Sequence, residues 1–340
     1  MKKKCGIITL HNVINYGAYL QAFALQTKLI QMGYDTEFVN LEESRIVSRF
    51  LQIKCKFPKR VIYNYRLLTE FDKVIPMLNV SGNKNQDYDT VIVGSDELWN
   101  INNGGFKHRR EYLAYDLMAP NIISYAVSAN KVTCDEFRHF YGGSVDFSQF
   151  TRISVRDKNT YDLVKSISGI SPSIVCDPTL LLGNDWKKYA VRCKEKNFIM
   201  VYSFTVSEQE KKAIQRLAHS RGKQIISVGS YNPWCDQNIC VTPFEFLGYM
   251  QAADYVVTSS FHGVVFSTLF NKKFVVHPQT KSKVLDLMKR LHIEELDATD
   301  LDDLLIILDK EIDYTKINDT VSCFAQQSME WLRNAIEIDG

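Results

Sequence analysis

The chain has 340 residues, which at roughly 100–200 residues per domain favours two domains. Hydrophobic residues make up 45% and charged residues 24%, as in ordinary globular proteins that bury a large core without disulfide bonds or metals. The formal net charge is +2, from 41 Lys and Arg against 39 Asp and Glu, and this balance argues against a general nucleic-acid binder.

Short apolar runs alternate with segments of helical periodicity along the first half of the chain. Many of the runs are continuously apolar and β-branched, as in Val91-Ile92-Val93, which is typical of parallel strands covered on both faces. The pattern predicts strands over residues 5–10, 36–41, 90–93, 122–128, 152–155 and 173–177, and helices over 16–32 and 160–168.

The alternation restarts after a charged segment over residues 182–196 that lacks strand character. Strands are predicted over 198–204, 224–228, 254–259 and 273–277, and helices over 207–221, 243–252, 261–270, 282–291 and 321–338. Such alternation indicates βαβ units. We therefore expect an α/β protein of two Rossmann-like domains facing a cleft, with boundaries at 1–182 and 183–320. The segment 321–340 is expected to be a helix that packs back on the first domain.

The residues that follow each strand are the first place to search for a site, because ligands of such sheets bind beyond the carboxyl ends of the strands. One strand is followed by Ser259, Ser260, Phe261, His262 and Gly263. Either serine can cap the next helix, whose first-turn N–H groups can bind an anion. His262 is a candidate general acid or base, or a buried packing residue. Gly263 allows close backbone approach or eases packing.

Two loops of the first half offer further candidates. Asn15 and Gly17 open a helix with outward-facing N–H groups, although an ordinary turn explains them equally well. Ser95 and Asp96 can bind a sugar hydroxyl or orient a catalytic group, or Asp96 can cap a helix. Trp99 can stack on a sugar face, but core packing is favoured for a lone tryptophan.

Three charged or titratable residues follow other strands. Arg156 can hold a carboxylate or phosphate with two parallel hydrogen bonds, or it can form an ion pair with Asp157 or Asp177. His277 and Lys283 can add positive charge around a phosphate, although ordinary solvated lysines explain part of this pattern.

Five of these segments together resemble a known family. The chain contains NYGAYLQAFALQ, DTVIVGSDELWN, ISVRDKNTYDLV, PSIVCDPTLLL and SSFHGVVFSTLFNKKF in that order. The ordered set resembles the polysaccharide pyruvyl transferase family, from the first strand to at least Leu291. The resemblance implies a fold like that of GT-B glycosyltransferases, with the active site between the two domains.

The resemblance also implies an activity, the transfer of a pyruvyl group from phosphoenolpyruvate to sugar hydroxyls as a cyclic ketal, during surface polysaccharide biosynthesis. His262 matches the family histidine that contacts or protonates the donor, and Arg156 matches an arginine that binds donor anions. Two positions depart from the family pattern. Ser260 stands where many relatives carry Arg, and Lys283 follows Ser282 where relatives often show a Ser-Arg pair.

A set of site roles follows from the resemblance and the loops together. The expected catalytic residues are His262 as the acid and Asp96 as the group that orients or deprotonates the acceptor. We expect phosphoenolpyruvate as a co-substrate, with no cofactor and no metal. Donor-binding residues are expected to be Arg156, Ser259, Ser260, Gly263, Asn15, Gly17 and Lys283, and acceptor-binding residues Ser95, Trp99 and His277.

Two other functions fit the same architecture. The first is a nucleotide-sugar glycosyltransferase of GT-B type, although the second half lacks the Glu-x7-Glu pair of many such enzymes. The second is a non-catalytic sugar-binding protein, which the Ser260 departure favours. Fold alone does not decide between them.

Cysteine usage and hydropathy predict the compartment. The eight cysteines are scattered without a CxxC pair or zinc spacing, which indicates a reducing, cytoplasmic compartment. No run approaches the ~18–20 apolar residues of a membrane span. The basic and apolar segment 49–68 predicts a solvated helical insertion, or alternatively contact with the inner membrane face and a lipid-linked oligosaccharide acceptor. We expect at most peripheral membrane contact and no nucleic-acid partner.

Overall fold

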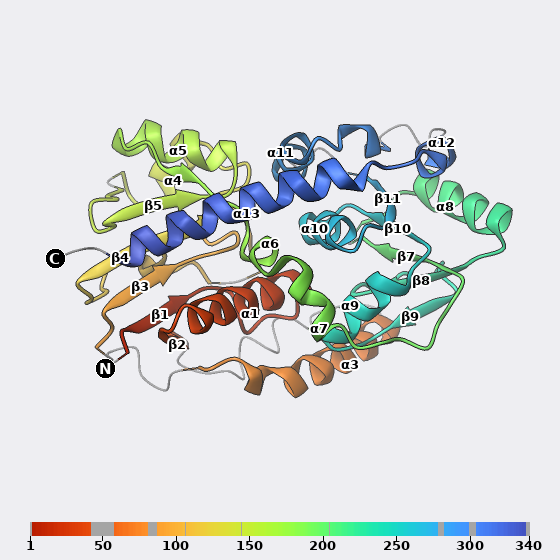
Figure 1. The fold of residues 1–340 in the computed structure, drawn as a ribbon, viewed down its shortest axis with the longest axis horizontal. Helices are drawn as coiled ribbons and strands as arrows, with labels where there is room; N and C mark the ends of the chain where they lie inside the picture. The colour runs from red at the N-terminus through yellow and green to blue at the C-terminus, as the bar shows by residue number, and fades with distance from the viewer. Residues whose placement is uncertain are drawn as a thin grey trace.

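The computed structural model describes two parallel β-sheets joined by helices (Figure 1). The six strands of the first sheet lie within residues 4–174 and the five of the second within 198–276, on either side of the predicted division. Domain boundaries at 182 and 320 stay a prediction. The residues described are 2–41, 58–80, 87–105, 107–143, 145–203, 205–277, 282–298 and 304–337.

The first sheet has the strand order β2-β1-β3-β4-β5-β6, with every neighbouring pair parallel. The chain passes from β1 to β2 on one side and then returns to β3 on the other side of β1. The carboxyl ends of β1 and β3 therefore form the topological switch point, where ligands of such sheets bind. The strands are β1 (Lys4–Ile8), β2 (Asp35–Phe38), β3 (Thr90–Val93), β4 (Asn121–Val127), β5 (Arg152–Val155) and β6 (Ser173–Ile174).

The second sheet has the order β11-β10-β7-β8-β9 and is also parallel throughout. Its switch point lies between β7 and β10, because the chain runs from β7 to β9 on one side before it returns to β10. The strands are β7 (Phe198–Tyr202), β8 (Gln224–Val228), β9 (Gln237–Ile239), β10 (Tyr255–Thr258) and β11 (Lys273–Val276).

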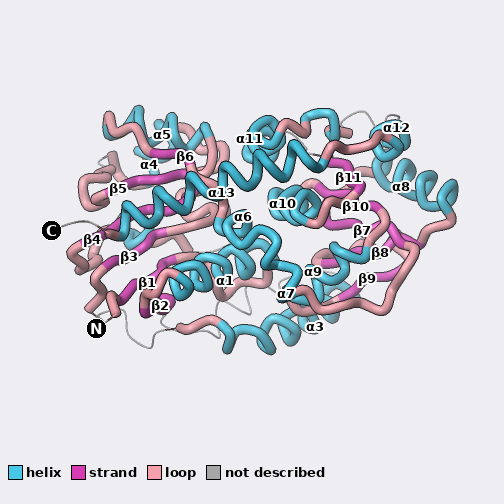
Figure 2. Tube along the Cα trace, in the orientation of Figure 1, coloured by secondary structure: helices cyan, strands magenta, loops and turns pink. Residues whose placement is uncertain are grey.

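Helices cover both sheets (Figure 2), and side-chain caps define where several of them begin. Thr133, Ser207 and Thr242 each form a capping box with the Glu three residues later. The helices are α1 (Tyr16–Gln31), α3 (Pro58–Val74), α4 (Cys134–Phe140), α5 (Lys158–Ser168), α6 (Pro178–Leu182), α7 (Trp186–Tyr189), α8 (Glu208–Arg221), α9 (Pro243–Ala252), α10 (Phe261–Leu269), α11 (Ser282–Leu291), α12 (Leu304–Asp309) and α13 (Tyr314–Ile336).

The strand predictions identify all but one of these strands. β9 was not predicted, because its three residues are short and polar. The predicted strand 173–177 is shorter in the structure, since Asp177 already caps α6. The segment 58–68 lies in the helix α3, as the insertion hypothesis expected, whereas 49–57 lie outside the described residues. No helix in the described ranges is long and apolar enough to cross a membrane.

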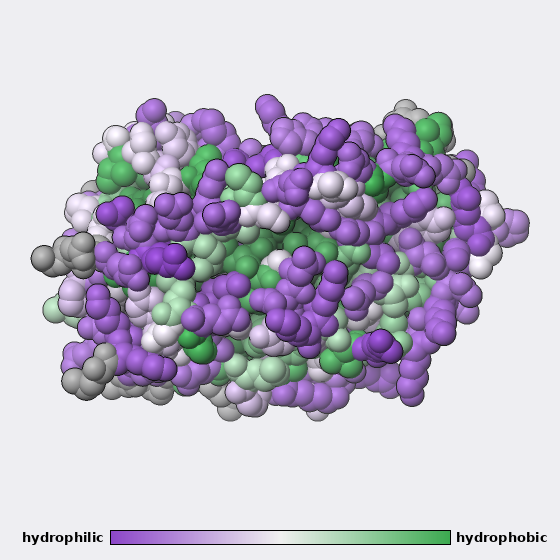
Figure 3. All heavy atoms as spheres, in the orientation of Figure 1, coloured by the Kyte–Doolittle hydropathy of each residue, from purple (hydrophilic) through white to green (hydrophobic). Residues whose placement is uncertain are grey.

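The long helix α13 begins at Tyr314, seven residues earlier than predicted, and runs past both sheets (Figure 1). On the first sheet, Asn121 Nδ2 of β4 donates to the Ala335 carbonyl at 2.9 Å, and Tyr125 lies 6.1 Å from the Trp331 ring. The helix therefore packs back on the first half of the chain. Hydrophilic residues predominate on the face of the molecule that Figure 3 shows.

One apolar cluster crosses from the first sheet to the second. Tyr16 at the start of α1 stacks on Phe246 of α9 with ring centroids 4.4 Å apart, and its hydroxyl donates to the Val241 carbonyl at 2.9 Å. Tyr63 of α3 likewise donates to the Ile239 carbonyl at 3.0 Å. These buried contacts hold the carboxyl-end loops of the two sheets against each other.

Candidate functional site

The loops at the two switch points meet at Gly17 and His262. His262 stands in the first turn of α10, which follows β10, and Gly17 stands in the first turn of α1, which follows β1. A Cβ atom on Gly17 would lie 1.9 Å from His262 Nδ1, so any side chain there would displace the imidazole. Position 17 thus requires glycine because the histidine approaches closely, and not because of the backbone conformation of Gly17.

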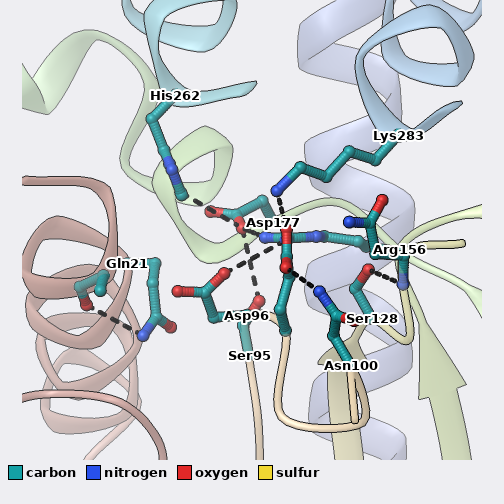
Figure 4. A network of polar contacts seen from close by, with 12 residues as sticks. Gln21, Ser95, Asp96, Asn100, Ser128, Arg156, Asp177, His262 and Lys283 are labelled. Carbon is teal, nitrogen blue, oxygen red and sulfur yellow. Dashed lines mark hydrogen bonds and ion pairs between the residues drawn. The ribbon is translucent and has the colours of Figure 1, made fainter. Parts of the chain in front are cut away.

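A buried arginine lies at the centre of the site (Figure 4). Arg156 follows β5, and its side chain is 1% exposed. Its Nη1 lies 2.6 Å from Asp177 Oδ2 and its Nη2 lies 3.2 Å from Asp96 Oδ1. The guanidinium carbon also sits 4.5 Å from the centroid of the Phe261 ring. Burial opposes the charge, but the Asp96 and Asp177 carboxylates raise the pKa of Arg156 above its ordinary value.

Asp177 connects the arginine to the histidine. Its Oδ1 caps α6 by accepting from the Thr179 N–H at 3.0 Å, which fixes the carboxylate. Its Oδ2 accepts from Arg156 and from the Ser95 hydroxyl, the latter at 3.4 Å. Burial would raise the pKa of Asp177, but His262 and Arg156 outweigh burial and hold it well below its usual value.

His262 points its Nε2 toward Asp177 (Figure 4). The distance from Nε2 to Asp177 Oδ2 is 3.6 Å, and Nε2 has no hydrogen-bond partner among the described residues although it is buried. A buried polar nitrogen without a partner is costly and calls for a reason such as a catalytic role.

A second buried ion pair closes the site beside Arg156. Lys283 of α11 pairs with Glu97, and Asn100 Nδ2 donates to the other Glu97 oxygen at 2.5 Å. Burial raises the pKa of Glu97, but Lys283, Arg156 and Asn100 together lower it to about 2. The five charged residues Asp96, Glu97, Arg156, Asp177 and Lys283 form, with His262, what we call the buried cluster.

Two residues that were expected to bind the donor also form ion pairs, and their contact with a donor stays a prediction. Arg156 was expected to bind donor anions. Each of its Nη groups contacts one carboxylate oxygen, whereas its buried Nε has no hydrogen-bond partner among the described residues. The alternative ion pair with Asp177 is the one that the structure contains. Lys283 was expected near the donor phosphate and is instead paired with Glu97. Both residues therefore hold other side chains in position.

The expected acceptor residues of the first domain are also corrected. Trp99 is fully buried, donates from Nε1 to the Tyr112 carbonyl at 2.7 Å, and packs against Phe147 and Phe150. Its faces are therefore closed to a sugar. Ser95 is fully buried and donates to the Ala126 carbonyl at 2.9 Å, so it supports Asp177 and not an acceptor.

Three other predicted residues have structural roles. The Asn15 side chain caps α1 by accepting from the Ala18 N–H at 3.2 Å. A Cβ on Gly263 would lie 2.0 Å from Thr258 Oγ1, so the glycine serves close packing of α10 on β10. His277 Nε2 lies 2.6 Å from Glu210 Oε1 at the start of α8, and this is its ion-pair contact within the described residues.

The serines before His262 lie at the switch point of the second sheet. Ser259 is fully buried, and Ser260 is the N-cap residue of α10 without a side-chain capping bond. The hydroxyl of Tyr202, at the carboxyl end of β7, interacts with Ser260. Both serines are thus beside His262, and their contact with a donor stays a prediction.

Asp177 and Glu97 were not assigned roles in the site from the sequence. Asp177 was considered as an ion-pair partner, and it directly follows a strand, the criterion that selected the other candidates. Glu97 lies next to Asp96 in a loop already selected. Ser203 was also missed. It follows β7 at the switch point and has a buried hydroxyl without a partner in the described part of the chain.

Comparison with protein families yields one match. A family described as polysaccharide pyruvyl transferase matches residues 15–276, which include Asp96, Arg156, Asp177 and His262. No curated protein sequence matches the chain.

Comparison with solved structures shows the fold. A Listeria monocytogenes protein assigned provisionally as a UDP-N-acetylglucosamine 2-epimerase is similar at 11% identity, covering 99% of this chain and 96% of that one (TM-score 0.57). Another UDP-N-acetylglucosamine 2-epimerase has 12% identity, with coverages of 98% and 96% (TM-score 0.55). The S. aureus MnaA structure with UDP has 13% identity, with coverages of 100% and 99% (TM-score 0.51). The predicted GT-B-like fold is confirmed.

Proposed function

The chain belongs to the polysaccharide pyruvyl transferase family, and on that premise we propose that it moves a pyruvyl group from phosphoenolpyruvate to two hydroxyls of a sugar. The products would be a cyclic ketal and inorganic phosphate. The observation that carries the proposal is the buried His262 Nε2, which faces the Asp177 carboxylate at 3.6 Å where the two switch points meet.

In the first chemical step, His262 acts as the general acid. The imidazolium would give a proton to the methylene carbon of phosphoenolpyruvate, which becomes a methyl group and leaves an oxocarbenium-like centre at C2. Asp177 would stabilise the imidazolium before transfer, and Arg156 would keep Asp177 ionised and in place. General acid catalysis of this kind contributes about 10²–10⁴-fold in rate.

The second step forms the ketal. One sugar hydroxyl attacks C2 and loses its proton, the C2–O bond to phosphate breaks, and a second hydroxyl closes the ring at C2 with loss of a second proton. Of the two released protons, one replaces the proton that His262 gave to the methylene carbon, and the other is taken up by the leaving phosphate. Asp96 is our candidate to orient or deprotonate the acceptor, since its side chain is at the more open edge of the buried cluster.

The donor anions need partners besides Arg156 and Lys283, because carboxylates already engage part of the hydrogen-bonding capacity of both cations. We assign this role to the first-turn N–H groups of α10 and to the hydroxyl of Ser203, with Ser259 and Ser260 beside them. We expect no metal and no further cofactor. The enzyme would act in the cytoplasm on an oligosaccharide acceptor, and a lipid-linked acceptor would place it at the inner membrane face.

The test separates binding from turnover by changing His262 to Asn. We expect phosphoenolpyruvate to bind wild type and variant in calorimetry, and phosphate release with a diol acceptor to fall about 10²–10⁴-fold in the variant. His219→Asn is the matched control, because His219 is exposed on α8 and should leave turnover unchanged.

The outcomes discriminate between the candidate functions. Unchanged turnover in His262→Asn would remove the acid role. Binding of UDP-, GDP- or CMP-sugars in place of phosphoenolpyruvate would identify a nucleotide-sugar transferase, which the likeness to UDP-N-acetylglucosamine 2-epimerases keeps as the second candidate. No binding of any donor would leave a sugar-binding protein.

A further inference from the structure

An open pocket lies at the carboxyl ends of β1 and β2, beside the buried cluster. None of the cluster residues lines it. The floor is apolar, from Ile8, Val39 and Val80, and His11, Lys107 and Arg109 stand among the polar lining residues. A mostly apolar pocket with a few polar groups is typical of a small-molecule site.

Thr9 connects this pocket to the buried cluster. It lines the pocket, and its hydroxyl donates to the Ser95 carbonyl at 3.0 Å and accepts from Gln21 Nε2 at 2.9 Å. Ser95 in turn donates to Asp177 at 3.4 Å. A molecule in the pocket would therefore lie next to the polar side chains that lead to Asp177 and His262.

Lys107 and Arg109 give the pocket positive charge, and no carboxylate stands beside them in the part of its lining that the structure describes. Lys107 and Arg109 have no side-chain ion pair or hydrogen bond within the described ranges, in contrast to Arg156 and Lys283. Cations in a concave wall attract anions, and a guanidinium suits the paired oxygens of a carboxylate or phosphate.

We propose that this pocket binds the acceptor through an oxyanion, so that the preferred acceptor is an acidic sugar. The oxyanion is the carboxylate of a uronic acid or the phosphate of a sugar phosphate. Arg109 and Lys107 hold the oxyanion, while the apolar floor takes the less polar face of the ring. This inference rests on the proposed function, since it assigns the donor to the His262 side of Thr9 and the oxyanion of the acceptor to the pocket, from which the acceptor hydroxyls reach past Thr9 toward the donor.

The test compares three acceptor probes in the absence of donor. Calorimetry with the full chain would use methyl glucoside, methyl glucuronide and glucose 6-phosphate, with inorganic phosphate as competitor. We expect the glucuronide or the phosphate sugar to bind at least tenfold more tightly than the neutral glucoside. The tighter of the two identifies whether carboxylate or phosphate is the natural oxyanion.

Variants locate the binding to the pocket. Arg109→Met and Lys107→Met should each weaken binding of the tighter acidic probe by roughly tenfold, the loss of one charge-assisted contact. Arg110→Met is the matched control. Arg110 is 70% exposed, lies 3.8 Å from Asp116, and does not line the pocket, so its loss should not change binding.

Two results would overturn the inference. Equal binding of neutral and acidic probes would exclude an oxyanion site. Weaker binding of phosphoenolpyruvate in Arg109→Met would show that the pocket holds the donor. A failure of the proposed function is distinguishable, because it would appear as absent pyruvyl transfer with every acceptor, whereas this inference fails in an enzyme that still transfers pyruvyl groups without acidic preference.

Discussion

Arg156 and Arg109 both lie on the first domain near the carboxyl ends of its strands, but their surroundings differ completely. Arg156 is 1% exposed and pairs with two carboxylates. Arg109 lines an open pocket and has no side-chain ion pair in the part of the chain that the structure describes. The same contrast separates Lys283, paired with Glu97, from Lys107, which lines the pocket beside Arg109.

The difference shows how one residue type serves two purposes. The charge of a buried cation is stable only when anions surround it, and two N–H groups of Arg156 hold Asp177 and Asp96. A cation at an open pocket keeps most of its hydration and remains able to bind an incoming carboxylate or phosphate. Position relative to carboxylates, and not residue type, thus decides which arginine holds other side chains in place and which stands open to a ligand.

The largest expected effect is a difference in stability between variants of the two arginines. Arg156→Met should destabilise the protein by about 3–5 kcal/mol, because it leaves the buried Asp177 and Asp96 carboxylates without their cation. Arg109→Met should change the free energy of unfolding by less than about 0.5 kcal/mol, as for ordinary surface substitutions. Urea denaturation of both variants measures the difference. Similar losses of stability in the two variants would contradict the distinction.

The second prediction uses pH to test the Lys283 and Glu97 pair. The pKa of Glu97 is lowered from 4.5 to about 2, so its contribution to stability is fully present above pH 4.5 and is lost as the pH falls toward 2. At 1.36 kcal/mol per unit, this contribution is on the order of 3 kcal/mol. Glu97→Gln should therefore cost most at neutral pH.

The measurement is the urea stability of wild type and Glu97→Gln at pH 7 and pH 3. The gap between the two proteins should narrow at the lower pH, because protonated Glu resembles Gln. A gap that stays constant with pH would mean that Glu97 acts through packing alone. Glu330→Gln offers a control, since Glu330 is exposed on α13 and lies outside the buried cluster.

The smallest expected effect is that of salt on the affinity of the open pocket for acidic probes. Raising the ionic strength from about 0.05 M to about 0.5 M should weaken acidic-probe binding at the open pocket several-fold, because exposed charges are screened. The stability cost of Arg156→Met should change little, since buried pairs are screened much less. Salt-insensitive binding of glucose 6-phosphate would argue that its oxyanion is buried and not held at Lys107 and Arg109.

Part of the site could be predicted from local sequence. The rule that ligands bind beyond strand ends selected His262, Asp96 and Arg156, and the structure places all three together. The same rule applied to Asp177 would have found the residue that links them. It could not reveal that Trp99 is enclosed by Phe147 and Phe150, because those rings come from a segment about 50 residues further along the chain.

The sequence by itself determined the alternation of strands and helices, the two-sheet architecture and the family, because these depend on local apolar patterns and on motif order. Tertiary structure alone decided which charges are paired. Arg156 meets Asp96 across 60 residues and Lys283 meets Glu97 across 186 residues, and such partners are set by how the switch points dock. The physical reason is that the strength of a charge pair depends on the distance between the charges and on their burial. Neither quantity can be read from the positions of the residues in the sequence.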